Sequence, residues 1–260
     1  MSKRVVVVGA ASGIGAHALE RFVERGDEVI ALDVRKPADG SVRFVECDLR
    51  DPAGIASAAA ALPDGIDVVA HVAGIPGTWS DEDVLAVNFL GLRQLLRDVV
   101  PKVREGGAVT VVASTAGAGW YRRLEELEPL LATDSMASGL SWLADNPPQL
   151  PVYALSKMAT IAFVKRWSVA VWRNSHVRLN TVSPGSVETP ILVDFEKSMG
   201  KDVLDSVRDM VGRNATTADV VPVIEALSEP AFGWVIGQDV QVDGGFTAGL
   251  HSGGISFPSA

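Results

Sequence analysis

Residues 4–15, RVVVVGAASGIG, join an apolar run to a cluster of glycines. The valines show no polar alternation, which predicts a strand buried on both faces of a parallel sheet. Residues 16–25 have helical character, and a second apolar strand over 28–32 ends on Asp33. Three glycines alone are equally compatible with an ordinary turn. Strand, glycine turn, helix, strand and acid in this order instead predict a dinucleotide-binding unit, where glycines let the backbone approach a pyrophosphate.

Apolar strands and helices continue to alternate along the chain. Further strands are expected at 42–46, 67–72, 108–113, 176–182 and 238–242, and further helices at 51–62, 83–103, 152–174 and 217–227. This rhythm predicts an α/β fold, namely a Rossmann-type doubly wound parallel sheet of about seven strands with helices on both faces. Without an internal repeat or linker, residues 1–260 are expected to form a single dinucleotide-binding catalytic domain. An insertion at about 116–150 and a flap at about 190–212 interrupt the rhythm.

Composition narrows the class of protein. The 260 residues carry a formal net charge of −9, which argues against nucleic-acid or anionic-membrane partners. Cys47 is the only cysteine, so no disulfide can form within the chain. No apolar run approaches the roughly 20 residues that span a bilayer, and residues 5–11 are too short for a signal segment. We therefore expect a cytoplasmic protein, without a metal site.

Polar and small residues follow the predicted strands. Gly9, Asp33, Asp48, Gly74 and Ser114 each stand at the carboxyl end of one strand. Ligands of parallel sheets bind beyond these ends, so we expect the five residues to share one site. The Asp33 carboxylate is placed to accept both ribose hydroxyls of a dinucleotide and to repel a 2′-phosphate. The alternative for Asp33 is a turn residue that ends a strand.

The segment PVYALSK at 151–157 places Lys157 four residues after Tyr153, so on a helix their side chains share one face. A free phenol has a pKa near 10 and is a poor acid or base at neutral pH. A cation beside it favours the phenolate and lowers that pKa toward working pH. Tyr-x-x-x-Lys alone more often marks a solvated helix face, so the prediction depends on the other motifs.

Together, these landmarks resemble the short-chain dehydrogenase/reductase family over residues 4 to about 247. Asn88, Ser114, Tyr153 and Lys157 match the catalytic tetrad of that family. Asp33 matches the acid that selects NAD over NADP, and Asp48 matches the acid that meets the adenine amino group. The residues that match its cofactor-binding segments are Gly9, Ser12, Gly13, Ile14, Gly15, Asp33, Asp48, Leu49, Ala73, Gly74, Tyr153, Lys157, Pro184, Gly185, Val187 and Thr189.

The sequence also departs from the family pattern. Val8 stands where threonine is usual, and His71-Val72 where two asparagines are usual. We expect His71 to have a structural role in its strand and not a catalytic one. Ser114 and Tyr153 are 39 positions apart, because the insertion lies between them. An insertion at this place is most similar to the bacterial 3α-hydroxysteroid dehydrogenase/carbonyl reductase group.

The resemblance implies an NAD(H)-dependent short-chain alcohol dehydrogenase or carbonyl reductase, which transfers hydride between a secondary alcohol or ketone and NAD. Tyr153 would move the proton, Lys157 would lower the tyrosine pKa, Ser114 would hold the substrate oxygen, and Asn88 would fix a water. One alternative is an NADP-linked ketoacyl or carbonyl reductase, which Arg35 leaves open. Another is an NAD-binding scaffold without turnover, which the intact tetrad argues against.

Apolar residues in the insertion and flap favour a bulky substrate such as a steroid, terpenoid or aryl ketone, and plain packing explains them equally well. They are Trp120, Trp142, Leu150, Ile191, Leu192 and Met199. Because 116–150 and 190–212 both follow strand ends, we expect both to lie over the mouth of the site, the flap as a mobile lid. The resemblance further implies a homo-dimer or homo-tetramer, whose usual helical contact surface the insertion is placed to cover.

Overall fold

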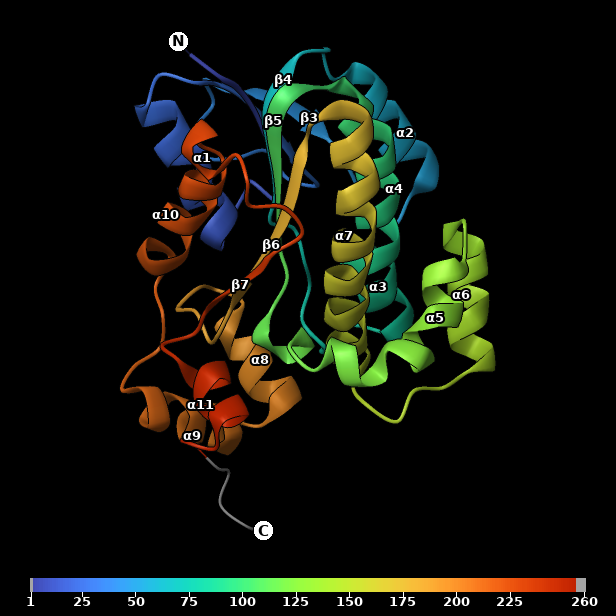
Figure 1. The fold of residues 1–260 in the computed structure, drawn as a ribbon, viewed down its shortest axis with the longest axis vertical. Coiled ribbons are helices and arrows are strands. Elements are labelled where there is room, and N and C mark those ends of the chain that lie inside the picture. Colours follow the sequence, from blue (N-terminus) through green and yellow to red (C-terminus); the bar gives the residue numbers. More distant parts are fainter. Residues whose placement is uncertain (1, 256–260) are drawn as a thin grey trace.

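A computed structural model, which describes residues 2–255, places seven strands in one parallel sheet with the order β3-β2-β1-β4-β5-β6-β7 (Figure 1). The strands are β1 Arg4–Val8, β2 Glu28–Asp33, β3 Arg43–Glu46, β4 Ile66–His71, β5 Val103–Val112, β6 Arg178–Pro184 and β7 Asp239–Val242. The order reverses between β1 and β4, which is the switch point where doubly wound sheets bind ligands. The predicted fold class is confirmed.

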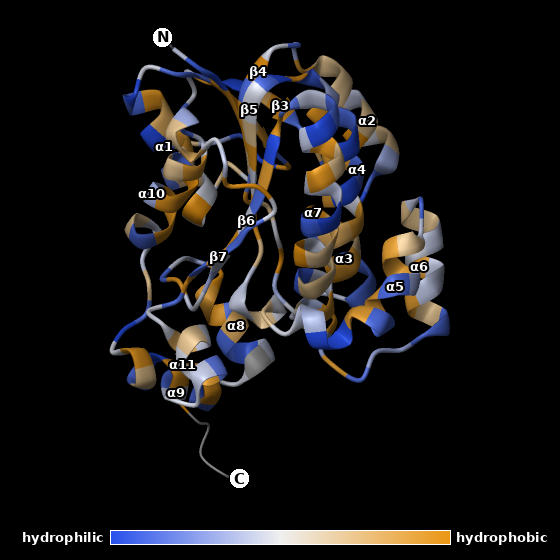
Figure 2. Ribbon diagram, in the orientation of Figure 1, coloured by the Kyte–Doolittle hydropathy of each residue, from blue (hydrophilic) through white to orange (hydrophobic). Residues whose placement is uncertain are grey.

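Helices cover both faces of the sheet. One face carries α1 (Gly13–Glu24) and α10 (Thr217–Leu227), and the other carries α2 (Pro52–Ala61), α3 (Asp81–Leu85), α4 (Leu92–Val99) and α7 (Val152–Ser175). In Figure 2 the ribbons of α1, α7 and α10 alternate between hydrophobic and hydrophilic colours. Such amphipathic helices bury one stripe against the sheet and leave the other in water.

The helix expected over 83–103 is broken into pieces. A π-helical turn, Ala86–Gly91, joins α3 to α4, and a 3₁₀ turn, Val100–Lys102, follows α4. β5 then begins at Val103, five residues before the expected strand. Gly106 has a φ of 77°, and the β4–β5 register shifts between Ile66 and Val68. The sequence pattern missed the first half of β5 because this irregular part has exposed, polar residues.

The insertion does not lie over the mouth of the site, so that expectation is wrong. Its helices α5 (Leu124–Ala132) and α6 (Met136–Asp145) pack on the outer side of α7 and of the π-helical turn (Figure 1). The buried guanidinium of Arg93 fixes the loop between them through the carbonyls of Thr133 at 2.6 Å and Ser135 at 3.2 Å. Trp120, Trp142 and Leu150 are half-buried against the same core, as the packing alternative expected.

The flap consists of two helices, α8 (Leu192–Met199) and α9 (Lys201–Val211), which meet at Gly200 with a φ of 90°. Against α9, and below α8 in Figure 1, lies α11 (Phe246–Ser252), in a segment where the sequence indicated no element. Gly244 and Gly245, both with positive φ, turn the chain from β7 into this helix.

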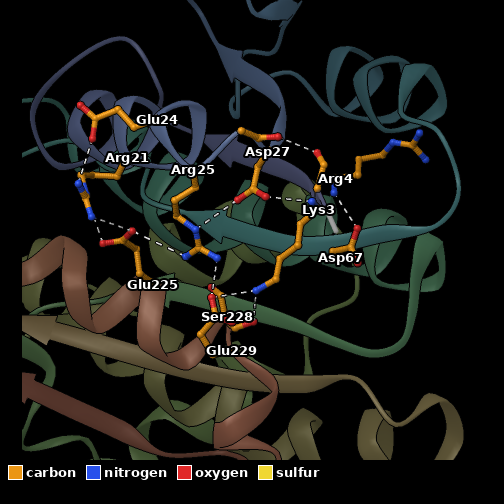
Figure 3. A network of polar contacts seen from close by, with 12 residues as sticks. Lys3, Arg4, Arg21, Glu24, Arg25, Asp27, Asp67, Glu225, Ser228 and Glu229 are labelled. Atoms are coloured by element: carbon orange, nitrogen blue, oxygen red, sulfur yellow. Dashed lines mark hydrogen bonds and ion pairs between the residues drawn. The ribbon is translucent and has the colours of Figure 1, made fainter.

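The opposite end of the sheet is closed by a polar network (Figure 3). The Lys3 ammonium donates to Glu229 at 2.9 Å and to the carbonyl of Ser228 at 3.3 Å. Arg25, which follows α1, donates to the same Glu229 carboxylate at 2.6 Å and lies 3.5 Å from Asp27. The network therefore joins the start of β1 and the end of α1 to the end of α10.

Candidate active site

One cavity of about 1470 Å³ runs along the carboxyl ends of the strands. Typical small-molecule pockets measure roughly 300–1,000 Å³, so this cavity has room for two ligands. The predicted site residues that line it are Gly9, Ser12, Gly13, Ile14, Asp33, Asp48, Leu49, Ala73, Gly74, Ser114, Tyr153, Lys157, Pro184, Gly185, Val187 and Thr189. Gly15 and Asn88 lie directly behind this lining.

The glycine loop is shaped to bring backbone close to a ligand. A Cβ on Gly9, whose φ is 84°, would stand 2.6 Å from the backbone of Ala73, and a Cβ on Gly15 would stand 1.9 Å from the Gly9 carbonyl oxygen. Only glycine fits at either place. α1 begins at Gly13, so its unpaired backbone N–H groups face the cavity as an anion-binding site. These residues fit the pyrophosphate of a dinucleotide.

Two carboxylates stand at the next strand ends. Asp33 accepts from the backbone N–H of Ala11 at 2.9 Å and of Arg35 at 3.0 Å, which holds the carboxylate against the glycine loop. Asp48 is engaged by the forked guanidinium of Arg50, with Nε to Oδ1 at 3.0 Å and Nη2 to Oδ2 at 2.7 Å. These hydrogen bonds, together with the Arg50 charge, lower the pKa of Asp48.

Sequence reasoning missed the part of Arg50. Its guanidinium also lies over the ring of Trp79, 5.7 Å from the centroid, and both side chains line the cavity. Arg50 and Trp79 together form part of the cavity wall next to Asp48. The signal for it was weak, because an arginine two residues after an aspartate usually marks a solvated turn.

Tyr153 and Lys157 share one face of α7, as predicted. The Lys157 Nζ lies 5.7 Å from the centre of the Tyr153 ring and 3.4 Å from the carbonyl oxygen of Val112. Burial lowers the pKa of Lys157 to about 8. Burial also raises the pKa of Tyr153 to about 12, against the opposite influence of the Ser114 hydroxyl. In the free chain, burial of the phenol therefore dominates, and the expected lowering of the Tyr153 pKa by Lys157 is not observed.

Asn88 sits in the π-helical turn and is fully buried. Its amide exchanges two hydrogen bonds with the backbone of Ile75, at 2.8 and 3.0 Å, which fixes the loop after β4. A Cβ on Gly74 would stand 3.2 Å from the Asn88 Oδ1 and 3.3 Å from the Lys157 Nζ. Gly74 therefore lets the amide and the ammonium approach the same point from two helices.

The far end of the cavity is mainly apolar. From the flap, Ile191, Leu192 and Phe195 line it, and the Phe195 ring meets the Tyr153 ring edge-on at 5.0 Å. The side chain of Met199 lies outside the described residues. Among the described residues of 116–150, Ala116 alone lines the cavity.

The C-terminal helix α11 forms a wall that the sequence did not predict. Phe246, Thr247, Ala248 and His251 line the cavity, and the His251 ring contacts Tyr121 of the insertion edge-on at 6.2 Å. Two glycines followed by FTAGLH contain too short an apolar pattern to indicate a helix without the rest of the fold.

Comparisons with known proteins agree with this geometry. The family described as enoyl-(acyl carrier protein) reductase matches residues 9–247. Coniferyl-alcohol dehydrogenase of Pseudomonas sp. (strain HR199 / DSM 7063) is 33% identical, over 95% of this chain and 97% of its own length. The 3-alpha-hydroxysteroid dehydrogenase/carbonyl reductase of Comamonas testosteroni is 30% identical, over 94% and 96%.

A solved structure extends the likeness to three dimensions. The 3-alpha-hydroxysteroid dehydrogenase from Pseudomonas sp. B-0831, complexed with NADH, has a TM-score of 0.82 at 29% identity, covering 98% of this chain and 100% of that chain. The family match spans nearly the whole chain, and two relatives reach at least 30% identity over almost their full lengths. The chain belongs to the short-chain dehydrogenase/reductase family of oxidoreductases.

Proposed function

We propose that this protein is an NAD-dependent alcohol dehydrogenase and carbonyl reductase that interconverts a secondary alcohol and a ketone on a bulky, apolar substrate. The observation that carries the proposal is the position of Ser114, Tyr153 and Lys157 in one cavity. These three residues lie between the glycine loop, which fits a dinucleotide pyrophosphate, and the apolar far end of the cavity.

The chain's own residues would handle the proton and the substrate oxygen. A bound nicotinamide dinucleotide supplies the hydride chemistry. The Tyr153 Oη takes the hydroxyl proton of the alcohol, or returns it to the ketone oxygen in the reverse direction. The Ser114 hydroxyl holds that oxygen, since it can both donate and accept. The Lys157 ammonium would favour the phenolate and would hydrogen-bond the nicotinamide ribose.

The preference for NAD over NADP rests on Asp33. Its carboxylate faces the place of the adenine ribose, where it would accept hydrogen bonds from two hydroxyls but repel a phosphate. The similar hydroxysteroid dehydrogenase was solved with NADH, which supports this choice. Arg35 also lines the cavity and is the residue that would favour the NADP-linked alternative.

The substrate class rests on the apolar far end. Ile191, Leu192, Phe195 and Phe246 offer aliphatic and aromatic surface to the group attached to the reacting carbon. The relatives are named as a coniferyl-alcohol dehydrogenase and a 3-alpha-hydroxysteroid dehydrogenase, that is, after an aryl-bearing alcohol and a steroid. We therefore favour an aryl, terpenoid or steroid alcohol.

A panel of alcohols tests the proposal. The protein is mixed with NAD and, in turn, with a 3α-hydroxysteroid, a secondary aryl alcohol, a secondary cyclic monoterpene alcohol and isopropanol, and NADH fluorescence is followed. We expect turnover with at least one bulky alcohol and little with isopropanol. Turnover only with NADP would favour the ketoacyl reductase alternative. Binding of NADH without turnover of any alcohol or of the matching ketones would favour the scaffold.

We also propose a cytoplasmic homo-dimer or homo-tetramer. The lone buried cysteine suits a reducing compartment. Within residues 2–255, every helix is too short or too polar to cross a membrane.

The proposed contact between subunits is at the β7 edge of the sheet. β7 is an edge strand, and the exposed Phe232 and Trp234 precede it, Trp234 with 86% of its surface exposed. A second copy of this chain would cover this edge by an isologous contact. Sedimentation as a 27.4 kDa species at micromolar concentration would contradict the proposed homo-oligomer.

A further inference from the structure

His71 is the last residue of β4 and is completely buried. It pairs with Val8 on one side and with Val111 on the other. Both valines belong to the core on the α7 side of the sheet, and side chains paired across strands share a face. The imidazole therefore points toward α7, into the layer behind the active site.

Neither ring nitrogen of His71 has a hydrogen-bond partner among the described residues. Burial, followed by the field of Lys157, lowers the pKa of His71 to about 3, so the ring is neutral. A neutral imidazole has one donor and one acceptor nitrogen. Leaving both unpaired in a protein interior is costly, and such groups are usually satisfied by a buried water.

The helices on the His71 side of the sheet bury several polar side chains. Asn88, Ser156, Lys157 and Thr160 are all buried there, with at most 4% of their surface exposed. The Thr160 hydroxyl donates to the carbonyl oxygens of Asn88 at 3.0 Å and Ser156 at 2.9 Å. These hydrogen bonds connect α7 to the π-helical turn. His71 is a buried polar side chain that the sheet contributes on this side.

Lys157 has a donor to spare in this layer. Its ammonium carries three N–H groups, and the protein acceptor described for it is the Val112 carbonyl at 3.4 Å. Val112 directly follows Val111, the cross-strand partner of His71. The ammonium thus lies near the residue that follows the cross-strand partner of His71, and it is close enough for its charge to lower the His71 pKa.

We propose that His71 is a positioning residue for the reaction: its neutral imidazole accepts a hydrogen bond, through one buried water, from the Lys157 ammonium. The water accepts a hydrogen bond from the Lys157 N–H and donates one to the unprotonated ring nitrogen of His71, which keeps the lysine charged and aimed at Tyr153. His71 touches neither substrate nor cofactor. The inference deepens the proposed function, since it concerns the lysine of the same proton-transfer site.

His71→Leu removes the acceptor while keeping an apolar, buried side chain. The Lys157 ammonium then loses a partner, its pKa falls further, and Tyr153 ionises at higher pH. In the pH profile of kcat for alcohol oxidation, we expect the apparent pKa to rise by about one unit and kcat at neutral pH to fall about tenfold. The KM for NAD should stay within about twofold, because the cofactor contacts are intact.

His71→Asn and Thr110→Val provide the matched comparisons. The asparagine amide can accept and donate, so the first variant should restore the wild-type pH profile at least in part. Thr110 is also buried with an unpartnered hydroxyl, but it lies on the neighbouring strand and faces the other side of the sheet. Thr110→Val should leave the profile unchanged. An equal shift in Thr110→Val, or an unshifted profile in a folded His71→Leu, would overturn the proposal.

A measurement without turnover separates this proposal from the proposed function. The imidazole nitrogen-15 resonances of His71, assigned by their loss in His71→Asn, should change their tautomer balance in Lys157→Met. If no alcohol is oxidised but these resonances respond, the His71–Lys157 coupling stands and the proposed reaction fails. Identical His71 resonances in the wild type and in Lys157→Met would contradict the proposed His71–Lys157 contact, whether or not the protein oxidises alcohols.

Discussion

Tyr153 is the residue on which the proposed proton transfer depends. Its pKa of about 12 in the free chain predicts that alcohol oxidation, which needs the phenolate, speeds up as pH rises, while ketone reduction slows. Tyr153→Phe should lower kcat by about 10²–10⁴-fold, the usual worth of a positioned acid–base group. NADH affinity, measured by fluorescence titration, should hardly change. A variant that keeps more than about a hundredth of wild-type kcat would contradict the assignment.

Asp33 is the residue on which the cofactor choice depends. Asp33→Ser removes the charge that repels a 2′-phosphate while keeping a small hydrogen-bonding group beside the loop amide of Ala11. We expect the ratio of kcat/KM for NAD over that for NADP to fall by at least tenfold, about 1.4 kcal/mol. Asp39→Ser, at a half-buried acid in the loop before β3 that does not line the cavity, is the matched control and should leave the ratio unchanged. Equal use of both cofactors by the wild type would remove the basis of this prediction.

At the scale of elements, the flap is the part expected to move. α8 rests on the site through the Phe195–Tyr153 contact, and Ser198 lies 3.5 Å from where a Cβ on Gly77 would stand. Closure over a substrate would expel water from the phenol. Amides of 190–212 should exchange hydrogen fast in the free protein and slowly with NADH and a substrate analogue. The insertion helices α5 and α6 should exchange equally in both states. Equal hydrogen-exchange protection of the flap with and without ligands would mean that it is a fixed wall of the cavity and not a lid.

The elements also mark how far the sequence could lead. Unbroken valines in β1 and helical spacing in α7 are dictated by burial, so both were predictable from local pattern. The position of the insertion was not predictable from the sequence, because its apolar residues are equally compatible with a lid and with core packing. The buried contacts of Arg93 hold the insertion against the core. The wall formed by Phe246 and His251 was missed because a seven-residue helix carries almost no periodic signal.

For the whole molecule, the network of Lys3, Arg25 and Glu229 predicts sensitivity to acid. Burial disfavours the charged form of Glu229, but hydrogen bonds from Lys3 and Arg25 outweigh it and lower its pKa. A lowered carboxyl pKa stabilises the fold above the ordinary value and loses this effect as pH falls through the lowered one. Glu229→Gln should therefore reduce stability at pH 7 by about 1 kcal/mol and by less near pH 3, where protonation of the wild-type carboxylate weakens the effect.

Urea unfolding at both pH values measures this difference. Glu126→Gln is the matched control, because Glu126 makes a single exposed contact with Arg123 at 3.5 Å. It should change stability at neither pH. Equal loss in Glu229→Gln at pH 7 and pH 3 would mean that the side chain acts through packing and not through its charge.

The strand order has a consequence for the growing chain on the ribosome. β1 to β4, residues 4–71, make up one contiguous half of the sheet and carry the glycine loop and Asp33. β7 and α11, which complete the substrate side, are translated after the other six strands. Because the chain is synthesised from the amino terminus, the segments of the nucleotide half of the cavity leave the ribosome first. A chain that stops before Phe246 has a place for the dinucleotide and lacks the wall that would retain the alcohol.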